Sequence, residues 1–467
     1  MYDFAILGGG VIGCAIFNKL TRLGKKCLLL EKGMDVAVGT SKANSGIVHA
    51  GFDAKPGTLK AKLNVEGAKI FPHMCKELNV PYVKNGAVVV GNDESVIREL
   101  FDRGQQNGVE NLKILGRTQL KKLLPDINDG ISCGLYAQDS AIVSPYKLTI
   151  ALAEQAVING GEVVFGFDTT SVTKNINGYE ITNGVTSYTA SKIIVAVGSK
   201  HNDVADILGV KKYNIEFRRG EYYLLDKGAM DVNGLTVFPL PSASSKGVLI
   251  TPTVSGNVIV GPTSIVSPTD CTLTSISGLN EIRERSADIL SNVNLKKNIR
   301  VFSGIRTVVG DDFVIEKDPN NSDFVNVTGI CSPGLSACFG IANYVADLLG
   351  INGNEIDMKQ LTPIPTLQGK TIQQINELIA QDSRFGKIVC RCENISEMEI
   401  VCAINSPLKP CSIDCIKRRT RAGMGRCQGG FCFSKVMEII ARERGTTIDE
   451  VIKENNGSRI IVGDIKE

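Results

Sequence analysis

Four cysteines near the C-terminal end of this chain have the residue type and the spacing of a metal centre. Cys390 and Cys392 lie in the segment CRCE, and Cys427 and Cys432 lie in GRCQGGFC. Two close pairs of thiolates at such spacing bind iron–sulfur clusters or zinc. The C-x-C spacing of the first pair is less usual for structural zinc than C-x2-C, which favours the iron–sulfur cluster.

The other cysteines indicate the compartment. The chain has 14 cysteines, but with 467 residues it is too long to be a small secreted domain held by disulfides. No signal peptide is evident before the apolar segment FAIL. We therefore expect reduced thiols in the cytoplasm. Seven of the cysteines lie in the last 80 residues, which marks this part as a separate module. Within it, Cys402, Cys411 and Cys415 are expected to be small buried side chains.

A glycine-rich motif near the start predicts a second kind of site. Gly8, Gly10 and Gly13 form G-x-G-x-x-G between a predicted strand at 4–7 and a predicted helix at 11–23. The first glycine permits a tight turn, the second lets a pyrophosphate approach the backbone, and the third lets the helix pack on the strand. The positive end of the helix dipole would then face the phosphates.

An acidic residue supports the dinucleotide interpretation. A second predicted strand, within KCLLLEKG, ends at Glu31, 18 residues after Gly13. An acid in this place binds ribose hydroxyls and disfavours a 2′-phosphate. No second glycine motif is found, so one dinucleotide is expected.

Longer segments indicate which dinucleotide. The chain resembles the FAD-dependent amino-acid-oxidase-like superfamily, and within it the glycerol-3-phosphate oxidases and dehydrogenases and the L-2-hydroxyglutarate oxidases. The resemblance covers about residues 1–365 and rests on GGGVIG, GTSKANSGIVHAGFDAKPGTLKAKLNVEG, DSAIVSPYKLTIALAEQAVINGG, IIVAVGSKHNDVAD, FRRGEYYLLDKG, KGVLITPTVSGNVIVGPTS, SGIR and GICSPGLSACFGIA. The segment HAGFDAKPGTLKAKLNV is closer to the glycerol-3-phosphate branch.

The resemblance implies FAD as the cofactor and an α/β fold. A Rossmann-type FAD-binding domain would be interleaved with an antiparallel substrate-binding sheet, as period-2 runs such as GVLITPTVSGNVIVG also suggest. The FAD-contacting residues implied are Gly8, Gly10, Gly13, Glu31, Thr40, Ser41, Asn44, Ser45, Val172, Gly198, Gly334 and Leu335.

The same resemblance implies the reaction site. His49, in NSGIVHAG, should lie near the flavin ring and take the hydroxyl proton while hydride leaves the carbon, although a purely flavin-positioning role is the alternative. Arg306 and Lys246 would bind the anionic substrate, and Ser332 would donate a hydrogen bond. Arg218 and Arg219 are weaker candidates. An arginine suits phosphate and carboxylate equally, so it does not decide between the two substrates.

The C-terminal module has its own resemblance. Residues 387–445, with VCRCENISEMEI and CIKRRTRAGMGRCQGGFC, resemble the ferredoxin-like domain of bacterioferritin-associated ferredoxin. This implies a 2Fe–2S cluster on Cys390, Cys392, Cys427 and Cys432. A four-thiolate cluster is an anion, so nearby cations would stabilise the added electron. The basic residues before the last cysteine pair could do so, although a solvated surface is the simpler interpretation for each one: Lys417, Arg418, Arg419, Arg421 and Arg426.

The elements that must position these residues form three units. We expect an oxidoreductase unit at 1–366, with FAD parts near 1–80, 140–210 and 300–366 and substrate parts near 81–139 and 211–299. A packed linker helix is expected at 367–386, where Ile372, Ile375, Leu378 and Ile379 recur at helical spacing. The small helical iron–sulfur domain would occupy 387–467.

The predicted function is oxidation of sn-glycerol 3-phosphate to dihydroxyacetone phosphate, with electrons passing through the cluster to a protein or quinone acceptor. L-2-hydroxyglutarate oxidation is the nearest alternative, an amino-acid oxidase is a weaker one, and a redox-sensing or electron-carrier protein is an alternative of another class. A net charge of +3 gives no indication of nucleic-acid binding. No apolar run reaches the ~18 residues of a membrane span, so at most peripheral contact with the inner membrane face is expected.

Overall fold

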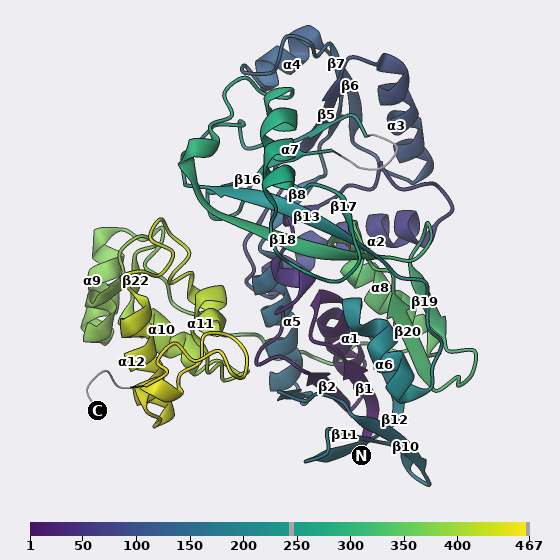
Figure 1. Cartoon of the computed structure of the whole chain (residues 1–467), viewed down its shortest axis with the longest axis vertical. Coiled ribbons are helices and arrows are strands. Elements are labelled where there is room, and N and C mark those ends of the chain that lie inside the picture. Colours follow the sequence, from purple (N-terminus) through teal and green to yellow (C-terminus); the bar gives the residue numbers. More distant parts are fainter. Residues whose placement is uncertain (242–246, 464–467) are drawn as a thin grey trace.

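The computed structural model describes residues 1–241 and 247–463. Figure 1 shows a large body that contains two sheets, and a smaller helical body formed by the C-terminal residues. None of the helices in these two ranges is long and apolar enough to cross a membrane.

The first sheet carries the glycine motif. Its order is β10-β11-β12-β1-β2-β9, with β20 paired to β12 and β19 to β20. The central strands β12, β1, β2 and β9 are parallel, and β20 is parallel to β12. The strands are β1 (Tyr2–Leu7), β2 (Cys27–Glu31), β9 (Glu162–Phe165), β10 (Ser171–Asn175), β11 (Gly178–Thr182), β12 (Ser187–Val195), β19 (Val314–Lys317) and β20 (Phe324–Thr328).

Strand β1 shows why this sheet is buried on both faces. Phe4 and Ile6 belong to the core on one side, whereas Ala5 and Leu7 belong to the core on the other. Successive side chains of a strand point to opposite faces, so the continuous apolar run FAIL suits a strand covered twice.

Helices cover one face of the first sheet and position the flavin-side segments. Helix α1 packs on α5 and α8, and α2 packs on α8. On the opposite face, helix α6 contacts β10, and its Ala205 belongs to the same core as Ala5 and Leu7. The bounds are α1 (Val11–Arg22), α2 (Leu59–Glu77), α5 (Pro145–Ile158), α6 (His201–Leu208) and α8 (Gly334–Leu348), with the short helices η1 (Thr40–Lys42) and η2 (Gly198–Lys200).

The second sheet is mostly antiparallel, as predicted. Its order is β17-β13-β16-β15-β14-β5-β7-β6, with β18 paired to β13, and only the β5–β14 pair is parallel among its printed registers. The strands are β5 (Ala87–Gly91), β6 (Leu112–Gly116), β7 (Cys133–Ala137), β13 (Glu216–Leu225), β14 (Thr236–Pro239), β15 (Leu249–Pro252), β16 (Val258–Gly261), β17 (Ile265–Ser267) and β18 (Asn298–Val308).

One boundary of the sequence analysis needs correction here. Strand β18 pairs with β13 along nearly its whole length, so residues 300–308 belong to the second sheet and not to the FAD part. Helices α3 (Glu94–Gln106), α4 (Arg117–Leu123) and α7 (Ile276–Ala287) and the short helix η3 (Leu295–Lys297) accompany this sheet. A small sheet of β3 (Ile47–Val48), β8 (Ala141–Val143) and β4 (Tyr82–Val83) follows the flavin-side loop.

The C-terminal body has a separate hydrophobic core, made mainly of residues between 390 and 451. Its elements are η4 (Ser383–Gly386), β21 (Ile388–Cys390), β22 (Ile395–Ser396), α10 (Glu397–Ile404), α11 (Ile413–Thr420), α12 (Phe433–Arg444) and η5 (Ile448–Glu450). The predicted linker helix exists as α9 (Ile372–Gln381), but it packs against η4 at the outer edge of the C-terminal body and has no buried residue. It does not lie between the two bodies.

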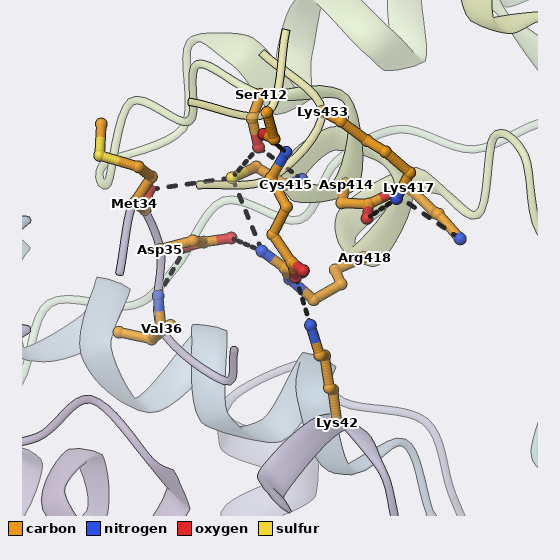
Figure 2. A network of polar contacts seen from close by, with 12 residues as sticks. Met34, Asp35, Val36, Lys42, Ser412, Asp414, Cys415, Lys417, Arg418 and Lys453 are labelled. Carbon is orange, nitrogen blue, oxygen red and sulfur yellow. Dashed lines mark hydrogen bonds and ion pairs between the residues drawn. The ribbon is translucent and has the colours of Figure 1, made fainter. Parts of the chain in front are cut away.

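Buried ion pairs join the two bodies. Asp35 follows β2 and is 1% exposed; its carboxylate accepts two hydrogen bonds from Arg419 (2.8 and 3.1 Å) and one from Arg418 (3.1 Å), both on α11. Figure 2 shows Asp35 and Arg418 facing each other across this boundary. Arg419 also approaches Glu154 of α5 at 3.4 Å. Since both arginines are almost fully buried, this is a fixed contact between the bodies.

Candidate active site and metal centre

A cavity of ≈ 1240 Å³ extends from the glycine loop after β1 to the β13–β18 strand pair. Most of the residues that the sequence analysis assigned to the flavin and to the reaction line it. They are Gly8, Gly10, Glu31, Thr40, Ser41, Asn44, Ser45, His49, Gly198, Arg306, Ser332, Gly334 and Leu335. The fold therefore brings together segments that are up to about 300 residues apart in the chain.

The glycine loop has the close contacts that its motif requires. Gly8 has a φ of +104°, and a Cβ there would lie 2.5 Å from the carbonyl oxygen of Ala196. A Cβ on Gly13 would lie 2.0 Å from the carbonyl oxygen of Gly8, so this glycine allows α1 to pack on the loop. Gly13 itself lies behind the loop and does not line the cavity, consistent with a packing role.

Side-chain oxygen atoms accept hydrogen bonds from backbone N–H groups in and around this loop. Glu31 accepts hydrogen bonds from the backbone N–H groups of Gly9 (2.5 Å) and Gly33 (2.6 Å), and Ser41 accepts one from Val11 at the start of α1 (2.8 Å). Burial raises the pKa of Glu31, while the two backbone hydrogen bonds oppose this shift. The carboxylate lies at the end of β2, where a ribose-binding acid is expected.

The segment 40–45 is held against the second sheet. Thr40 donates a hydrogen bond to the carbonyl oxygen of Ile305 (2.7 Å), and the Asn44 amide donates to the carbonyl oxygens of Thr40 and Ser41 (both 3.1 Å). Gly304 permits this approach, because a Cβ there would lie 2.0 Å from the carbonyl oxygen of Ala43. On the other side, Gly334 and Leu335 present the N-terminus of α8 to the cavity, which favours a partial negative charge there.

His49 lines the same cavity a few residues beyond Ser45 in the chain. Its backbone N–H donates to the Ser336 hydroxyl (2.8 Å), and its ring lies 5.7 Å from that of Phe238. The Ser336 hydroxyl in turn donates to the carbonyl oxygen of Ile47 (3.3 Å). The first turn of α8 therefore fixes the backbone that carries the imidazole.

Two arginines form the opposite wall. Arg218 of β13 and Arg306 of β18 are directly opposite in the antiparallel register, and both line the cavity. Arg306 donates to the carbonyl oxygen of Thr263, whereas its buried Nε has no hydrogen-bond partner. Arg218 forms an ion pair with Glu216. Directly opposite residues share one face of the sheet, so both guanidinium groups are directed toward the same region of the cavity.

Three sequence expectations have other outcomes. Lys246 lies outside the described residues. Val172 does not line the cavity; it lies in β10, partly buried against the core that contains Leu7 and Leu30. Arg218, a weaker candidate in the sequence, lines the cavity together with Arg306. No local pattern in the sequence distinguishes it from Arg219; Gly220 leaves room for Arg306, because a Cβ there would lie 2.9 Å from the guanidinium of Arg306.

The four C-terminal cysteines form two pairs. The sulfur atoms of Cys392 and Cys427 are 3.7 Å apart, and the thiols of Cys390 and Cys432 hydrogen-bond each other. Two thiolates bound at about 2.3 Å to one tetrahedral ion lie about 3.8 Å apart. Among the residues that the structure describes, no three His, Cys, Asp or Glu side chains converge as ligands of one ion. The four thiols are thus arranged as two pairs, and two thiolates for each iron is the ligand set of a 2Fe–2S cluster.

Backbone donors surround these sulfur atoms. The hydrogen bond with Cys432, with help from the N–H groups of Gly423 and Glu393, lowers the pKa of Cys390 to about 6. Burial opposes a low pKa at Cys427, but the N–H groups of Phe431 and Gly429 lower it. Hydrogen bonds to sulfur are one of the means by which proteins tune an iron–sulfur cluster. The donor set therefore fits a 2Fe–2S group.

A glycine supplies the space around the exposed pair. A Cβ on Gly425 would lie 2.2 Å from the Cβ of Cys392, so the loop can close on this cysteine only with glycine there. Cys390 and Cys432 are buried, Cys427 is partly exposed and Cys392 is exposed. One edge of the centre thus reaches the surface.

The basic segment before Cys427 is not a solvated surface. Arg418, Arg419 and Arg421 are buried, and carboxylates neutralise them: Asp35 and Glu154 as described above, and Glu393 for Arg421 (2.8 Å). Their charge therefore serves mainly the contact between the bodies rather than the cluster. Arg426, with 78% of its side chain exposed, pairs with Asp226.

The loop next to the cysteines also touches the flavin side. The Tyr146 hydroxyl lies 3.5 Å from the sulfur of Met424 and accepts a hydrogen bond from Arg421 (3.4 Å). Pro145, the preceding residue, lies 3.5 Å from the Cβ position of Gly46, next to the cavity residue Ser45. A short packed path thus joins the cavity wall to the cysteine loop.

Comparisons with known proteins agree with both sites. The family model described as FAD dependent oxidoreductase matches residues 3–348, and the model described as BFD-like 2Fe–2S binding domain matches residues 388–442. Glycerol 3-phosphate dehydrogenase from Caloramator mitchellensis is 41% identical over 100% of this chain and 99% of its own length. L-2-hydroxyglutarate dehydrogenase from Escherichia coli O17:K52:H18 is 30% identical over 57% of this chain and 65% of its own length.

A solved structure matches the larger body. The dithionite-reduced L-alpha-glycerophosphate oxidase from Mycoplasma pneumoniae with FAD bound has a TM-score of 0.71 and 28% identity, over 79% of this chain and 98% of that one. The glycine loop, the acid that ends β2 and the large cavity fit FAD, and the paired thiols fit the cluster. The chain belongs to the FAD dependent oxidoreductase family and is an enzyme that binds FAD and, in its C-terminal domain, a 2Fe–2S cluster.

Proposed function

We propose that this enzyme oxidises sn-glycerol 3-phosphate to dihydroxyacetone phosphate and that the electrons leave through the 2Fe–2S cluster to a separate protein or a quinone acceptor. The observation that carries the proposal is the pair Arg218 and Arg306 in one cavity wall. The full-length similarity to a glycerol 3-phosphate dehydrogenase supports it.

The charge arrangement favours a phosphate. The two guanidinium groups come from directly opposite residues, so they face the same side of the sheet and the same region of the cavity. A phosphate monoester carries up to two negative charges on one group, whereas L-2-hydroxyglutarate carries its two charges on carboxylates at opposite ends of the molecule. Arginine binds phosphate through two parallel hydrogen bonds. Two convergent arginines therefore suit the single dianionic group.

The reaction removes a proton and a hydride from a secondary alcohol. When bound, FAD supplies the two-electron acceptor for the hydride. The imidazole of His49 accepts the hydroxyl proton, and its backbone hydrogen bond to Ser336 holds it toward the cavity. Arg218 and Arg306 hold the phosphate, so the alcohol carbon has a fixed position. The carbonyl product carries the same phosphate and leaves through the same opening.

The surface position of the cysteine pair Cys392–Cys427 supports transfer to a separate acceptor. Cys392 is exposed, and the neighbouring Phe431 has 86% of its surface exposed. An apolar side chain left in water beside a redox centre is suited to contact another molecule.

Anaerobic stopped-flow spectroscopy tests the substrate. We expect glycerol 3-phosphate to bleach the flavin absorbance at least tenfold faster than L-2-hydroxyglutarate at equal concentration, followed by reduction of the cluster. The opposite order would assign the enzyme to the hydroxyglutarate branch. Bleaching by an amino acid alone would assign it to an amino-acid oxidase, and bleaching by none of these would favour an electron carrier.

A further inference from the structure

We infer that the iron–sulfur domain forms part of the FAD site, with Asn455 and Asn456 binding the adenosine end of the dinucleotide. Both residues follow the last short helix of the C-terminal domain and both line the large cavity. No part of the glycine motif predicts this, since these residues lie more than 400 positions away from it.

The position within the cavity indicates the adenosine end. The Oδ1 atom of Asn455 lies 3.5 Å from the Cβ position of Gly33, and the Nδ2 atom of Asn456 lies 3.9 Å from that of Gly166. Gly33 donates its N–H to Glu31, and Gly166 donates to the carbonyl oxygen of Gly33 (3.0 Å). The two asparagines therefore lie just beyond the acid that would bind the ribose. The next group of the dinucleotide at this place is the adenine.

The chemistry of an amide side chain suits an adenine. Adenine presents a ring-nitrogen acceptor beside an amino donor, and Asn offers the complementary donor and acceptor. Both asparagines are exposed in the absence of a ligand, so they can turn toward a base without losing buried contacts. The carboxylates of Glu31 and Asp168, at the same end of the cavity, only accept hydrogen bonds. They can therefore bind the amino group of adenine but not its ring nitrogen.

Ion pairs hold the loop of residues 453–458 in this place. Glu454 pairs with Lys42 of the flavin-side segment and with Arg418 of α11 (2.7 Å). Lys453 pairs with Asp414 (2.7 Å), and Figure 2 shows Lys42 of the flavin-side segment pointing across the boundary toward Arg418 and the C-terminal body. Within the loop, the Glu454 N–H donates to the Ser458 hydroxyl (2.9 Å). The loop is thus fixed to both bodies.

The same boundary also fixes the segment that follows Glu31. Asp35 is clamped by Arg418 and Arg419, and two residues later the Ala37 N–H donates to the carbonyl oxygen of Gly9 in the glycine loop (2.9 Å). The contacts that dock the iron–sulfur domain therefore also fix the segments that would hold FAD. Docking of the domain and binding of FAD should for this reason stabilise each other.

The test measures FAD affinity in the full-length protein. FAD is removed, and FAD binding is titrated by fluorescence for the wild type and the double variant Asn455→Ala/Asn456→Ala. We expect FAD to bind roughly 10- to 100-fold more weakly to the variant, the range for loss of one or two good amide–adenine contacts. Visible absorbance of the cluster and iron content report whether the C-terminal domain has folded.

Two ligands and a matched control make the result specific. ADP, which has only the adenosine end, should lose affinity by a factor similar to FAD, whereas FMN, which lacks it, should bind equally to both proteins. The control Asn177→Ala/Asn320→Ala removes two exposed amides outside the cavity and should bind FAD like the wild type. FAD affinity within twofold of the wild type, or an equal loss for FMN, would overturn the inference.

Discussion

Arg218 and Arg306 lie directly opposite each other on neighbouring antiparallel strands, and both face the large cavity. Arg218 forms an ion pair with Glu216, and Arg306 donates to the carbonyl oxygen of Thr263, so both arginines are held on the sheet. Under the proposed function both guanidinium groups also bind the substrate phosphate, and each should contribute to substrate affinity.

Arg218→Ala should weaken substrate binding more than turnover at saturation. Loss of a charge-assisted hydrogen bond to the phosphate costs about 1.5–3 kcal/mol, which raises KM for glycerol 3-phosphate by roughly one to two orders of magnitude. Steady-state kinetics with an artificial electron acceptor measure this directly. Arg98→Ala, on the exposed surface of α3, is the matched control and should leave KM unchanged. An unchanged KM in Arg218→Ala would place this arginine outside the substrate site.

His49→Ala should slow flavin reduction by substrate by roughly 10²–10⁴-fold, the usual effect of losing a general base. The cluster and the FAD content should remain as in the wild type. His73→Ala is the control, since this histidine is largely exposed on α2 and pairs with Glu77 away from the cavity. A His49→Ala enzyme with a normal rate of anaerobic flavin bleaching would show that another group accepts the proton.

Cys427→Ser should remove the cluster while flavin reduction by substrate continues. The two modules have separate hydrophobic cores, so loss of the partly exposed ligand Cys427 should leave the larger body folded. Iron analysis and the electron paramagnetic resonance signal of the reduced protein measure the loss. Cys402→Ser is the control and should keep two irons per chain, because Cys402 lies in α10 away from the paired thiols. Loss of flavin reduction in Cys427→Ser with FAD still bound would contradict the serial order of electron flow.

Asp35 should make the contact between the two bodies acid-sensitive. Burial alone would raise the pKa of Asp35, but Arg419 and Arg418 overcome this and hold it below its usual range. A carboxylate with a depressed pKa contributes stability that is present above the unfolded value near 3.9 and is lost as the pH falls through the folded pKa.

Asp35→Ala should therefore lower the free energy of unfolding by about 3–5 kcal/mol at neutral pH, because two buried arginines lose their partner. The difference from the wild type should shrink only below about pH 4, as measured by urea denaturation across pH. Asp129→Ala removes an exposed ion pair with Arg117 and should cost less than about 1 kcal/mol. A pH-independent difference between wild type and Asp35→Ala would show that packing, not charge, carries the effect.

The local sequence by itself determined the glycine loop, the acid at the end of β2 and the four cysteine ligands. Gly8 and Gly13 are predictable because only glycine fits a loop in which a Cβ would overlap the backbone, and the acid that ends β2 follows from the length of the strand–helix–strand unit. The cysteine pairs are predictable because thiolate ligands have few other uses at such spacing. The segment GVLITPTVSGNVIVG likewise predicts strands, and it forms β15 and β16, which are buried on both faces along nearly their whole length rather than on alternate residues.

Only the tertiary structure decided which distant side chains meet. The register of β13 against β18 sets Arg218 opposite Arg306, and nothing local distinguishes Arg218 from its neighbour Arg219, which pairs with the buried Glu221. Docking of the C-terminal body turned an apparently solvated basic segment into a buried ion-pair contact and brought Asn455 and Asn456 to the cavity. The sequence does not show whether a lysine or arginine faces solvent or pairs with a buried carboxylate, because the charge suits both environments. The packing of the two bodies decides this for Arg418 and Arg419, because it excludes water from Asp35.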